Sequence, residues 1–598
     1  MPLSEEVTAA AQRWLAIDPD AKTRAEVEGL VAAGDEATLR ARLLSGRMEF
    51  GTAGLRAAMG AGYDRMNQVT IAQSAQGLVK YLTSQFSAED LASRGVVVGY
   101  DGRYNSDIFA QITANACIAK NVKCRLTSSV VPTPYVAFAL RQFNCVAAVV
   151  VTASHNPKQD NGYKVYWANG AQIVPPHDGG IAKCIEESLD IDPATVGTAW
   201  HAIRGDCPIP AIEERFFATL QPMMERFQKL TSATPLKFTY TAMHGVGGNA
   251  VLRARDVAGL PEANFVVVKE QFSPDPEFST VTFPNPEEGK SSLDLAIAAA
   301  NAAGSTIILA NDPDADRLAV AEKDAATGAW RVLTGNELGA LLGWWMCEQN
   351  LADDVDFTKC VALSSTVSSQ ILRAYSRKFG FEFKETLTGF KWMGSIGGAA
   401  EDDEDRRIIF AFEQAIGFMC GNRVRDKDGV TALAVAVQMA AVLATQGKTL
   451  LQQLQALYAE FGAHVCSESY VTSKDPKRTM AMFDAIKGRD TKTGYPDAIG
   501  GIRVENVRDL RESSPIDTRQ PDGKPTLPLS SAPMVTFYLE GGAVLTVRGS
   551  GTEPKIKWYC EAIAADVAAG QKLVDKIVDG AINEILKPEE NGFVRRPE

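Results

Sequence analysis

Three aspartates at alternate positions form the most distinctive chemical pattern in the sequence. Asp312, Asp314 and Asp316 lie in NDPDADR, directly after an apolar run that predicts a buried strand. In an extended loop, alternate residues face the same side, so all three carboxylates are expected to approach one point. Their mutual repulsion of about 3 kcal/mol per pair favours a divalent cation, and hard oxygen ligands suit Mg²⁺. The simpler alternative is a solvated acidic turn in which Asp316 pairs locally with Arg317.

A second polar turn, TASHNP, follows the apolar run VAAVVV and contains Ser154 and His155. A serine hydrolase would need a histidine base and an acidic partner around this serine. His155 is the next residue, neighbouring side chains generally diverge, and no GxSxG turn surrounds the serine. A phosphoserine would instead give an aspartate-bound metal an oxygen ligand, and Lys164 in NGYKV is available for proton transfer.

A glycine-rich segment near the C-terminus, RGSGTEPK, combines small residues with the cations Arg548 and Lys555. The backbone N–H groups of residues 549–552 are predicted to turn inward and form an anion-binding nest. Arg548 suits a bidentate contact with phosphate. A plain glycine-rich hairpin is the alternative.

Two further segments place a charged residue among apolar ones. In FEQAIGF, the Glu413 carboxylate is suited to accept hydrogen bonds from sugar hydroxyls, and in LTGFKWMG, Lys391 lies between aromatic residues on a predicted turn. Taken singly, each charge is more typical of a solvated side chain. Phosphoryl transfer is the chemistry that uses all four segments together.

The elements that must position these loops alternate between strands and helices. Strands are predicted at residues 96–98, 146–151 and 306–310, and helices at residues 293–303, 429–447, 450–460 and 565–586. Gly304 is a predicted C-cap, and Asp428 a predicted N-cap. This alternation predicts α/β layers with parallel or mixed sheets, in which ligands gather at the carboxyl ends of strands.

The length and composition of the chain narrow the functional class. A chain of 598 residues is too long for one hydrophobic core, so several domains are expected. The predicted domains are residues 1–207, 208–328, 329–462 and 463–598. A formal charge of −12 argues against a nucleic-acid partner. The ten cysteines form no CxxC pair, which is typical of reduced thiols in the cytosol. With no signal-peptide pattern, and with the Ala-rich stretch at 429–447 expected to be a buried helix, a cytoplasmic protein without a membrane partner is predicted.

The motifs TASHNP, NDPDADR, FEQAIGF and RGSGTEPK, together with MEFGTAGLR and GYDGR, resemble those of the α-D-phosphohexomutase family. Along the chain, MEFGTAGLR and GYDGR come first, and TASHNP, NDPDADR, FEQAIGF and RGSGTEPK follow in that order. Together the six motifs cover nearly the entire chain. The segments WLAIDPDAKTR and RMEFGTAGLRAAMGAGYDRMN are similar to the branch that holds phosphopentomutase, glucose-1,6-bisphosphate synthase and many microbial phosphoglucomutases.

The resemblance implies an α/β protein with four domains around a central cleft. Three would be related αβ domains with mixed sheets, and the last an α+β domain that binds phosphate. Ser154 would be the phosphorylated serine and, with the three aspartates, would hold one Mg²⁺. Lys164 and His155 would assist proton transfer, while Arg56 and Arg317 would support the phosphoserine site.

The remaining site residues are also implied by the resemblance. The residues expected to contact the sugar or the non-transferring phosphate are Thr388, Gly389, Lys391, Glu413, Arg548, Ser550, Gly551, Thr552 and Lys555. One departure concerns the sugar loop, where the family usually has Glu-any-Ser and this chain has Ala415. A hydroxyl contact to the sugar is therefore lost.

The first functional hypothesis is a phosphoglucomutase that interconverts glucose 1-phosphate and glucose 6-phosphate. Its intermediate, glucose 1,6-bisphosphate, would also serve as activator and primer. Phosphopentomutase and glucose-1,6-bisphosphate synthase are the alternatives, followed by an aspartate-nucleophile phosphatase using Asp312 and by a non-catalytic sugar-phosphate sensor. The expected partners are small sugar phosphates, and a monomer is expected, with a weak homodimer left open.

Overall fold

The computed structural model describes residues 3–51, 54–203, 206–288, 291–473, 475–488, 491, 493–550 and 554–596. The chain forms two compact units and passes between them several times. Unit 1 comprises Met1–Leu338, Phe390–Ala411 and Ala415–Thr449, and unit 2 comprises Gly339–Gly389, Phe412–Gln414 and Leu450–Glu598.

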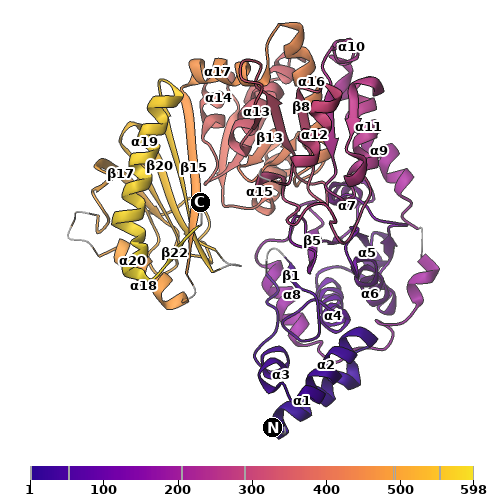
Figure 1. The fold of residues 1–598 in the computed structure, drawn as a ribbon. Helices are drawn as coiled ribbons and strands as arrows, with labels where there is room; N and C mark the ends of the chain where they lie inside the picture. Colours follow the sequence, from indigo (N-terminus) through magenta and orange to yellow (C-terminus); the bar gives the residue numbers. More distant parts are fainter. Residues whose placement is uncertain are drawn as a thin grey trace. The chain divides into compact units, whose positions relative to one another are not determined.

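Three helices begin the chain and pack on one another in unit 1 (Figure 1): α1 (Glu5–Ile17), α2 (Ala21–Ala33) and α3 (Glu36–Leu43). Asp20 and Asp35 start α2 and α3, since their carboxylates accept backbone N–H groups of the first helical turn. Trp14 is fully buried in this cluster, and its indole N–H donates to Asp18 at 2.9 Å. The three helices form a small hydrophobic core together with Ala61 and with Val69 of the helix that follows.

The first sheet of unit 1 has the order β1-β5-β4-β2-β3. Its strands are β1 (Leu55–Ala58), β2 (Val96–Tyr100), β3 (Cys124–Leu126), β4 (Ala147–Val151) and β5 (Asp160–Trp167). The accompanying helices are α4 (Gln68–Gln85), α5 (Ala88–Ser93), α6 (Ser106–Ala119), α7 (Thr133–Gln142) and α8 (His177–Glu186). β2, β3 and β4 are parallel, while β5 is antiparallel to β4 and to β1. The predicted strands at 96–98 and 146–151 are thereby confirmed.

The second sheet of unit 1 has the order β10-β9-β8-β6-β7. Its strands are β6 (Phe238–Thr241), β7 (Phe265–Val267), β8 (Ile307–Ala310), β9 (Ala319–Lys323) and β10 (Trp330–Val332), and its helices are α9 (Ile209–Glu225), α10 (Gln228–Ser232), α11 (Gly248–Ala258) and α12 (Asp294–Ala303). Gly304 ends α12 in the left-handed region, with φ of 70°, as predicted. Parallel β6, β7 and β8 and antiparallel β9 confirm a mixed sheet.

The following region contributes strands to both units. Its strands are β11 (Cys360–Ser365), β12 (Glu382–Thr386), β13 (Arg407–Glu413) and β14 (Gly417–Cys420), and its helices are α13 (Gly335–Ala352), α14 (Ile371–Phe379), α15 (Phe390–Glu404), α16 (Gly429–Thr445) and α17 (Leu450–Phe461). The Asp428 carboxylate accepts the N–H of Thr431 and caps α16, which is almost entirely buried, as predicted. Among the described helices, none is by itself long and apolar enough to cross a membrane; only α16 and α17 taken together reach that length and composition.

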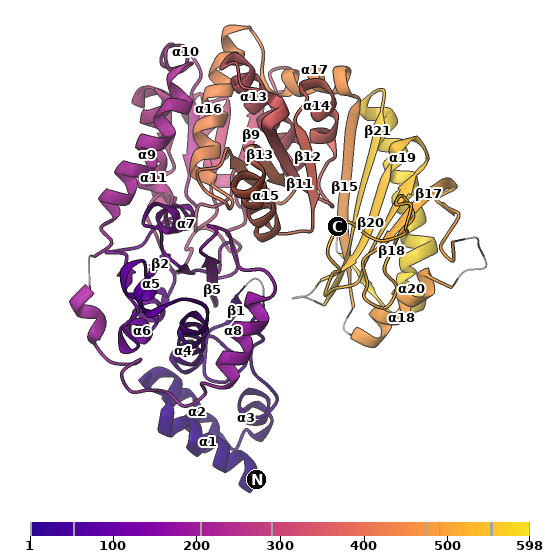
Figure 2. The same cartoon turned by 180° about the vertical axis from the view of Figure 1, so that it is seen from behind.

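An eight-stranded sheet dominates the C-terminal part of unit 2, with the order β16-β17-β19-β20-β21-β15-β22 and β18 paired with β17. Its strands are β15 (Ala463–Thr472), β16 (Ala498–Ile499), β17 (Ile502–Asp509), β18 (Ile516–Asp517), β19 (Met534–Leu539), β20 (Val544–Gly549), β21 (Lys555–Ala564) and β22 (Val594–Arg595). Its helices are α18 (Pro476–Ile486), α19 (Val567–Gly580) and α20 (Pro588–Asn591). Helix α19 lies along β15 and β21 (Figure 2). The helix predicted at 565–586 is α19 followed by a π-helical turn at Ala581–Leu586.

The predicted domain boundaries near residues 207 and 328 fall at a helix start and at a turn between two paired strands. Pro208 precedes α9 and Pro210 lies in its first turn, as is usual for proline at a helix start. The turn at 325–329 joins β9 and β10, which pair with each other, so the second sheet extends through Val332, beyond the predicted boundary at 328. The division into four domains stays a prediction.

Candidate active site

Ser154 lies immediately beyond the end of β4, in the loop that leads to β5. Its backbone is left-handed, with φ of 54°, and its N–H donates to the Thr152 hydroxyl at 2.8 Å. The side chain is buried, and its Oγ donates to Oδ2 of Asp312 at 2.8 Å. The serine loop and the aspartate loop, far apart in sequence, therefore meet in unit 1.

The three aspartates occupy the loop after β8 and converge as predicted. One ligand oxygen from each of Asp312, Asp314 and Asp316 lies within 4.8 Å of the others, and all three side chains are buried. The predicted extended loop is wrong, because the loop turns: the Asp312 carbonyl accepts the N–H of Ala315, whose φ is 57°. The alternative of a solvated acidic turn is excluded by the burial.

Two lysines and a threonine surround the aspartates. From β5, the Lys164 ammonium donates to Asp314 at 2.7 Å and to Asp316 at 3.0 Å. Lys427 lies 3.0 Å from Asp316, and the Thr133 hydroxyl at the start of α7 donates to Asp314 at 2.6 Å. In the described part of the chain, Oδ1 of Asp314 and Oδ1 of Asp316 are buried without a hydrogen-bond donor. These free oxygens, in an all-carboxylate set, can bind a metal ion.

The three aspartates of the cluster differ in pKa. Burial and the two neighbouring carboxylates raise the pKa of Asp312 well above its usual value. Burial raises the pKa of Asp314, but the Lys164 ammonium outweighs it and the net pKa is lowered. For Asp316, burial and the Asp314 carboxylate raise the pKa, and Lys164, Lys427 and Arg317 together lower it further than that. Burial disfavours the charged form of Lys164 as well, yet Asp314 and Asp316 raise its pKa. Lys164 is therefore held as an ammonium between two carboxylates.

The structure corrects one expectation about His155. Its Nδ1 lies 3.3 Å from the Ser154 Oγ, so the two neighbouring side chains do not diverge. The left-handed backbone of Ser154 brings them together. The ring also meets the edge of Phe283, and no carboxylate of the described residues is hydrogen-bonded to it. Without that acidic partner, the arrangement is not a hydrolase triad.

Arg56 contacts the serine loop, and Arg317 contacts the aspartate loop. Nη1 of Arg56, on β1, donates to Oδ1 of Asn156 at 3.2 Å. The backbone N–H of Arg317 donates to Oδ1 of Asp312 at 3.0 Å, and its guanidinium lies 3.5 Å from Glu287. The local pairing of Arg317 with Asp316 is weak, at 4.0 Å.

The sugar-loop residues divide between the two units. In unit 2, the N–H of Gly389 donates to the Glu413 carboxylate, and the buried Oγ1 of Thr388 has no hydrogen-bond partner among the described residues. The N–H of Gln414, which follows Glu413, donates to the Ser368 hydroxyl at 3.0 Å. Lys391 belongs to unit 1 and lies in the first turn of α15, so its predicted position on a turn is wrong.

The glycine-rich segment joins β20 to β21 in unit 2. Arg548 is the last but one residue of β20, and Lys555 is the first residue of β21. The Lys555 ammonium lies 4.5 Å from the centre of the Tyr470 ring. The predicted nest is not formed by the first two residues, because the N–H of Gly549 donates to Pro533 and that of Ser550 to Lys555. Gly551 and Thr552 lie outside the described residues. The role of this segment in binding phosphate therefore stays a prediction.

Comparison with known proteins decides the family. Three models of the phosphoglucomutase/phosphomannomutase family, for alpha/beta/alpha domains I, II and III, match residues 47–191, 214–328 and 334–461. The chain belongs to the α-D-phosphohexomutase family. Its matching domain models are those of phosphomutases, and this protein is an intramolecular phosphotransferase of the isomerase class. The predicted fold class and reaction class are confirmed.

Its relatives extend over its whole length. Phosphopentomutase from Homo sapiens is 44% identical over 599 residues, covering 96% of this chain and 95% of the relative. Glucose 1,6-bisphosphate synthase from Homo sapiens is 42% identical over 612 residues, covering 99% and 96%. The crystal structure of a putative phosphomannomutase from Thermus thermophilus shares the fold, with a TM-score of 0.65 at 19% identity over 91% of this chain and 100% of that one.

Sequence reasoning missed two residues that contact the aspartate cluster. Lys427 occurs in RDKDG, just before the capped start of α16, and that charged segment was a signal for it. Thr133 carried no signal, because an isolated hydroxyl at a helix start is common. Its contact with Asp314 depends on how two sheets pack, which no local pattern specifies.

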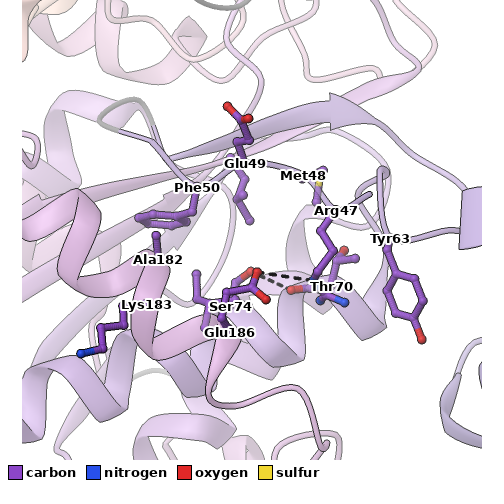
Figure 3. Close-up of a pocket in the computed structure, with 12 residues that line it drawn as sticks. Arg47, Met48, Glu49, Phe50, Tyr63, Thr70, Ser74, Ala182, Lys183 and Glu186 are labelled. Carbon is purple, nitrogen blue, oxygen red and sulfur yellow. Dashed lines mark hydrogen bonds and ion pairs between the residues drawn. The ribbon is translucent and has the colours of Figure 1, made fainter. Parts of the chain in front are cut away.

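A pocket of about 560 Å³ lies elsewhere in unit 1 (Figure 3). The segment around Arg47 and Phe50 forms one wall, and α4 and α8 form the others. Arg47 lies over the Tyr63 ring and 3.8 Å from Glu186. None of the residues predicted for catalysis lines this pocket, and its charged groups of both signs indicate no particular ligand.

Proposed function

We propose that the protein is a phosphopentomutase that interconverts ribose 1-phosphate and ribose 5-phosphate through a phosphoserine at Ser154. The observation that carries the chemistry is the contact of the buried Ser154 hydroxyl with Asp312, within reach of two more carboxylates. The preference for a pentose is supported by the 44% identity to phosphopentomutase over 96% of the chain.

Ser154 gives its phosphoryl group to a sugar hydroxyl. The bond between phosphorus and Oγ breaks, a bond to the sugar oxygen forms, and the hydroxyl proton passes to a base. In the reverse step, neutral His155 is placed to take the proton of Ser154, because its Nδ1 lies 3.3 Å from Oγ. Burial, followed by Arg317 and Arg56, lowers the pKa of His155 well below its usual value, which keeps the ring neutral.

Asp312, Asp314 and Asp316, with an oxygen of Ser154, are the residues that would hold Mg²⁺. When bound, the ion neutralises charge that develops on the transferred group. Lys164 supplies further positive charge beside the same carboxylates and is the second candidate for proton transfer, as an acid towards the departing oxygen. Arg56 and Arg317 add cations beside the serine loop.

The other half of the reaction requires recognition of the sugar and of the phosphate that is not being transferred. Glu413 and Thr388 offer an acceptor and a hydroxyl for the sugar, and Lys391 adds a cation. Arg548 and Lys555 would bind the other phosphate by charge, and Ser550, Gly551 and Thr552 would bind it by hydrogen bonds. Because the bound bisphosphate must present either phosphate to Ser154, a cationic site serves better than a closely shaped one.

A second candidate is phosphoglucomutase activity, the first hypothesis from the sequence. The 42% identity to glucose 1,6-bisphosphate synthase over 99% of the chain favours glucose phosphates as additional substrates. The absence of a side-chain hydroxyl at Ala415 favours the smaller set of sugar contacts that a pentose needs. Glucose 1,6-bisphosphate is accordingly proposed as the primer that phosphorylates Ser154.

The test is a panel of kcat/KM values for ribose 1-phosphate, glucose 1-phosphate and mannose 1-phosphate, measured with Mg²⁺ and catalytic glucose 1,6-bisphosphate. Ribose 1-phosphate should exceed glucose 1-phosphate by at least tenfold, and Ser154→Ala should turn over none of them. A reversed ratio would make the protein a phosphoglucomutase. Release of inorganic phosphate without isomerisation would indicate a phosphatase instead.

A further inference from the structure

A buried guanidinium lies directly behind the serine loop. Arg103 belongs to GYDGR, just after β2, and its side chain is 1% exposed. Its Nη2 donates to the carbonyl oxygens of Ser154 and Asn156, both at 2.6 Å. Its Nη1 donates to those of Pro157 at 2.9 Å and Asp160 at 3.2 Å. One side chain thus binds four carbonyl groups of the loop that carries the nucleophile.

Other residues hold Arg103 itself in place. Its Nε lies 3.3 Å from the buried carboxylate of Asp101, which also accepts the N–H of Arg103 and the Ser106 hydroxyl. On its far side, the guanidinium lies 5.0 Å from the centre of the Phe278 ring, which comes from the second sheet's region of unit 1. The guanidinium presents its donors in fixed directions within one plane, whereas the three donors of a lysine ammonium rotate freely.

The carbonyl contacts determine where the loop N–H groups face. A trans peptide is planar, so the N–H of His155 points away from the side on which the Ser154 carbonyl meets Arg103. Pro157 has no N–H to offer. Among the described residues, the N–H of His155 donates to no acceptor. The loop therefore presents a free backbone donor next to Ser154, on the side opposite Arg103.

We propose that Arg103 is the positioning residue of the phosphoserine loop, holding its carbonyl groups back so that the N–H of His155 is free to bind an oxygen of the phosphoryl group on Ser154. The inference rests on the proposed phosphoserine mechanism. Arg103 contacts none of the residues proposed to bind the sugar and none of the three aspartates, and the four N–H groups of Nη1 and Nη2 all face backbone carbonyl groups. It therefore acts on the rate of phosphoryl transfer and leaves sugar affinity unchanged.

The test compares wild type with Arg103→Lys, and Arg511→Lys serves as the matched control. Arg511 is equally buried, at 3% exposure, and pairs with Asp509 in the C-terminal sheet. The amount of phosphoserine formed from glucose 1,6-bisphosphate gives the fraction of active molecules. The measured kcat divided by this fraction is the normalised kcat. If Arg103 served only to stabilise the fold, its replacement would lower the number of molecules that form phosphoserine and would leave the normalised kcat unchanged.

Arg103→Lys should lower the normalised kcat by roughly 10- to 100-fold, because small displacements of a reacting group have effects of that size. KM for the sugar phosphate should stay within about twofold, and Arg511→Lys should leave both values within about twofold. Wild-type normalised kcat in Arg103→Lys, a rise in KM alone, or an equal loss in the control would overturn the proposal. A wild-type enzyme without phosphoserine would overturn the proposed function instead.

Asp101→Asn tests the same inference should Arg103→Lys fail to fold. The change keeps the shape of the side chain and the acceptor for the Arg103 N–H, but removes the charge that holds the guanidinium. The normalised kcat should fall by about 3- to 10-fold with an unchanged KM. A normalised kcat equal to that of wild type would contradict the proposal.

Discussion

Replacing Lys164 with Met would leave two buried carboxylates without their shared cation. The three side chains are 7%, 0% and 0% exposed, so solvent cannot compensate for the loss. Breaking a buried ion pair costs about 3–5 kcal/mol. Asp316 keeps Lys427 at 3.0 Å and Asp314 keeps the Thr133 hydroxyl, which places the expected loss at the lower end, about 3 kcal/mol.

Mg²⁺ should reverse part of this loss. The ion would meet the same carboxylates without competition from the Lys164 ammonium, so it should stabilise Lys164→Met more than wild type. Unit 1 is larger than 250 residues, a size at which each kcal/mol shifts Tm by about 2 °C, so about 3 kcal/mol corresponds to a fall of at most roughly 6 °C. Saturation with ligand at 100 times its Kd restores about 2.7 kcal/mol.

The assay is differential scanning calorimetry in chelator and in excess Mg²⁺. Lys80→Met is the matched control, because Lys80 forms an exposed pair with Glu187 at a similar distance, 2.8 Å, and such pairs contribute about 0–1 kcal/mol. Lys164→Met should melt well below both other proteins in chelator and recover partly in Mg²⁺. An unchanged Tm in chelator, or an equal Mg²⁺ shift in all three proteins, would refute this account of the cluster.

Three further predictions concern unit 2 and the sugar loop. Glu413→Gln weakens a charge-assisted hydrogen bond worth about 1.5–3 kcal/mol, so kcat/KM should fall roughly ten- to hundredfold while the phosphoserine level stays constant; an unchanged kcat/KM would exclude this role. Ala415→Ser should raise the ratio of kcat/KM for glucose 1-phosphate over ribose 1-phosphate, and an unaltered ratio would show that this position does not select the sugar. Burial raises the pKa of Glu385, but Arg508 lowers it, and the net pKa is about 2 against an ordinary value of 4.5. The ion pair therefore stabilises the fold fully above pH 4.5 and progressively less as the pH falls towards 2. Glu385→Gln should therefore reduce the denaturant midpoint at pH 7, with a gap to wild type that narrows below 4.5, whereas a gap independent of pH would contradict the pairing.

Features set by neighbouring residues were predictable from the sequence. Gly304 ends α12 and Asp428 caps α16 because each acts within one turn of its own helix. The convergence of Asp312, Asp314 and Asp316 was also predictable from residue type and spacing. Its geometry was not, because Ala315 adopts a left-handed conformation that alanine rarely favours.

Features that depend on distant segments escaped prediction. The N–H groups of Gly549 and Ser550 are used by Pro533 and Lys555, since the strand register around the hairpin brings those carbonyl groups close. The contact between Ser154 and Asp312 spans 158 positions, and only the packing of two sheets creates it. Residue chemistry predicted that a phosphoserine at Ser154 would meet a metal bound by the aspartates, but not the direct hydrogen bond between the serine and Asp312.

The most direct test of the phosphoserine mechanism is to locate the phosphoryl group. The protein is incubated with glucose 1,6-bisphosphate, digested, and mapped by mass spectrometry, with Ser154→Ala as control. The mechanism predicts an acid-stable phosphate on Ser154, lost on addition of a sugar monophosphate substrate, and no phosphopeptide in the variant. Phosphate on Asp312 or on any other residue, or full mutase turnover in Ser154→Ala, would contradict it.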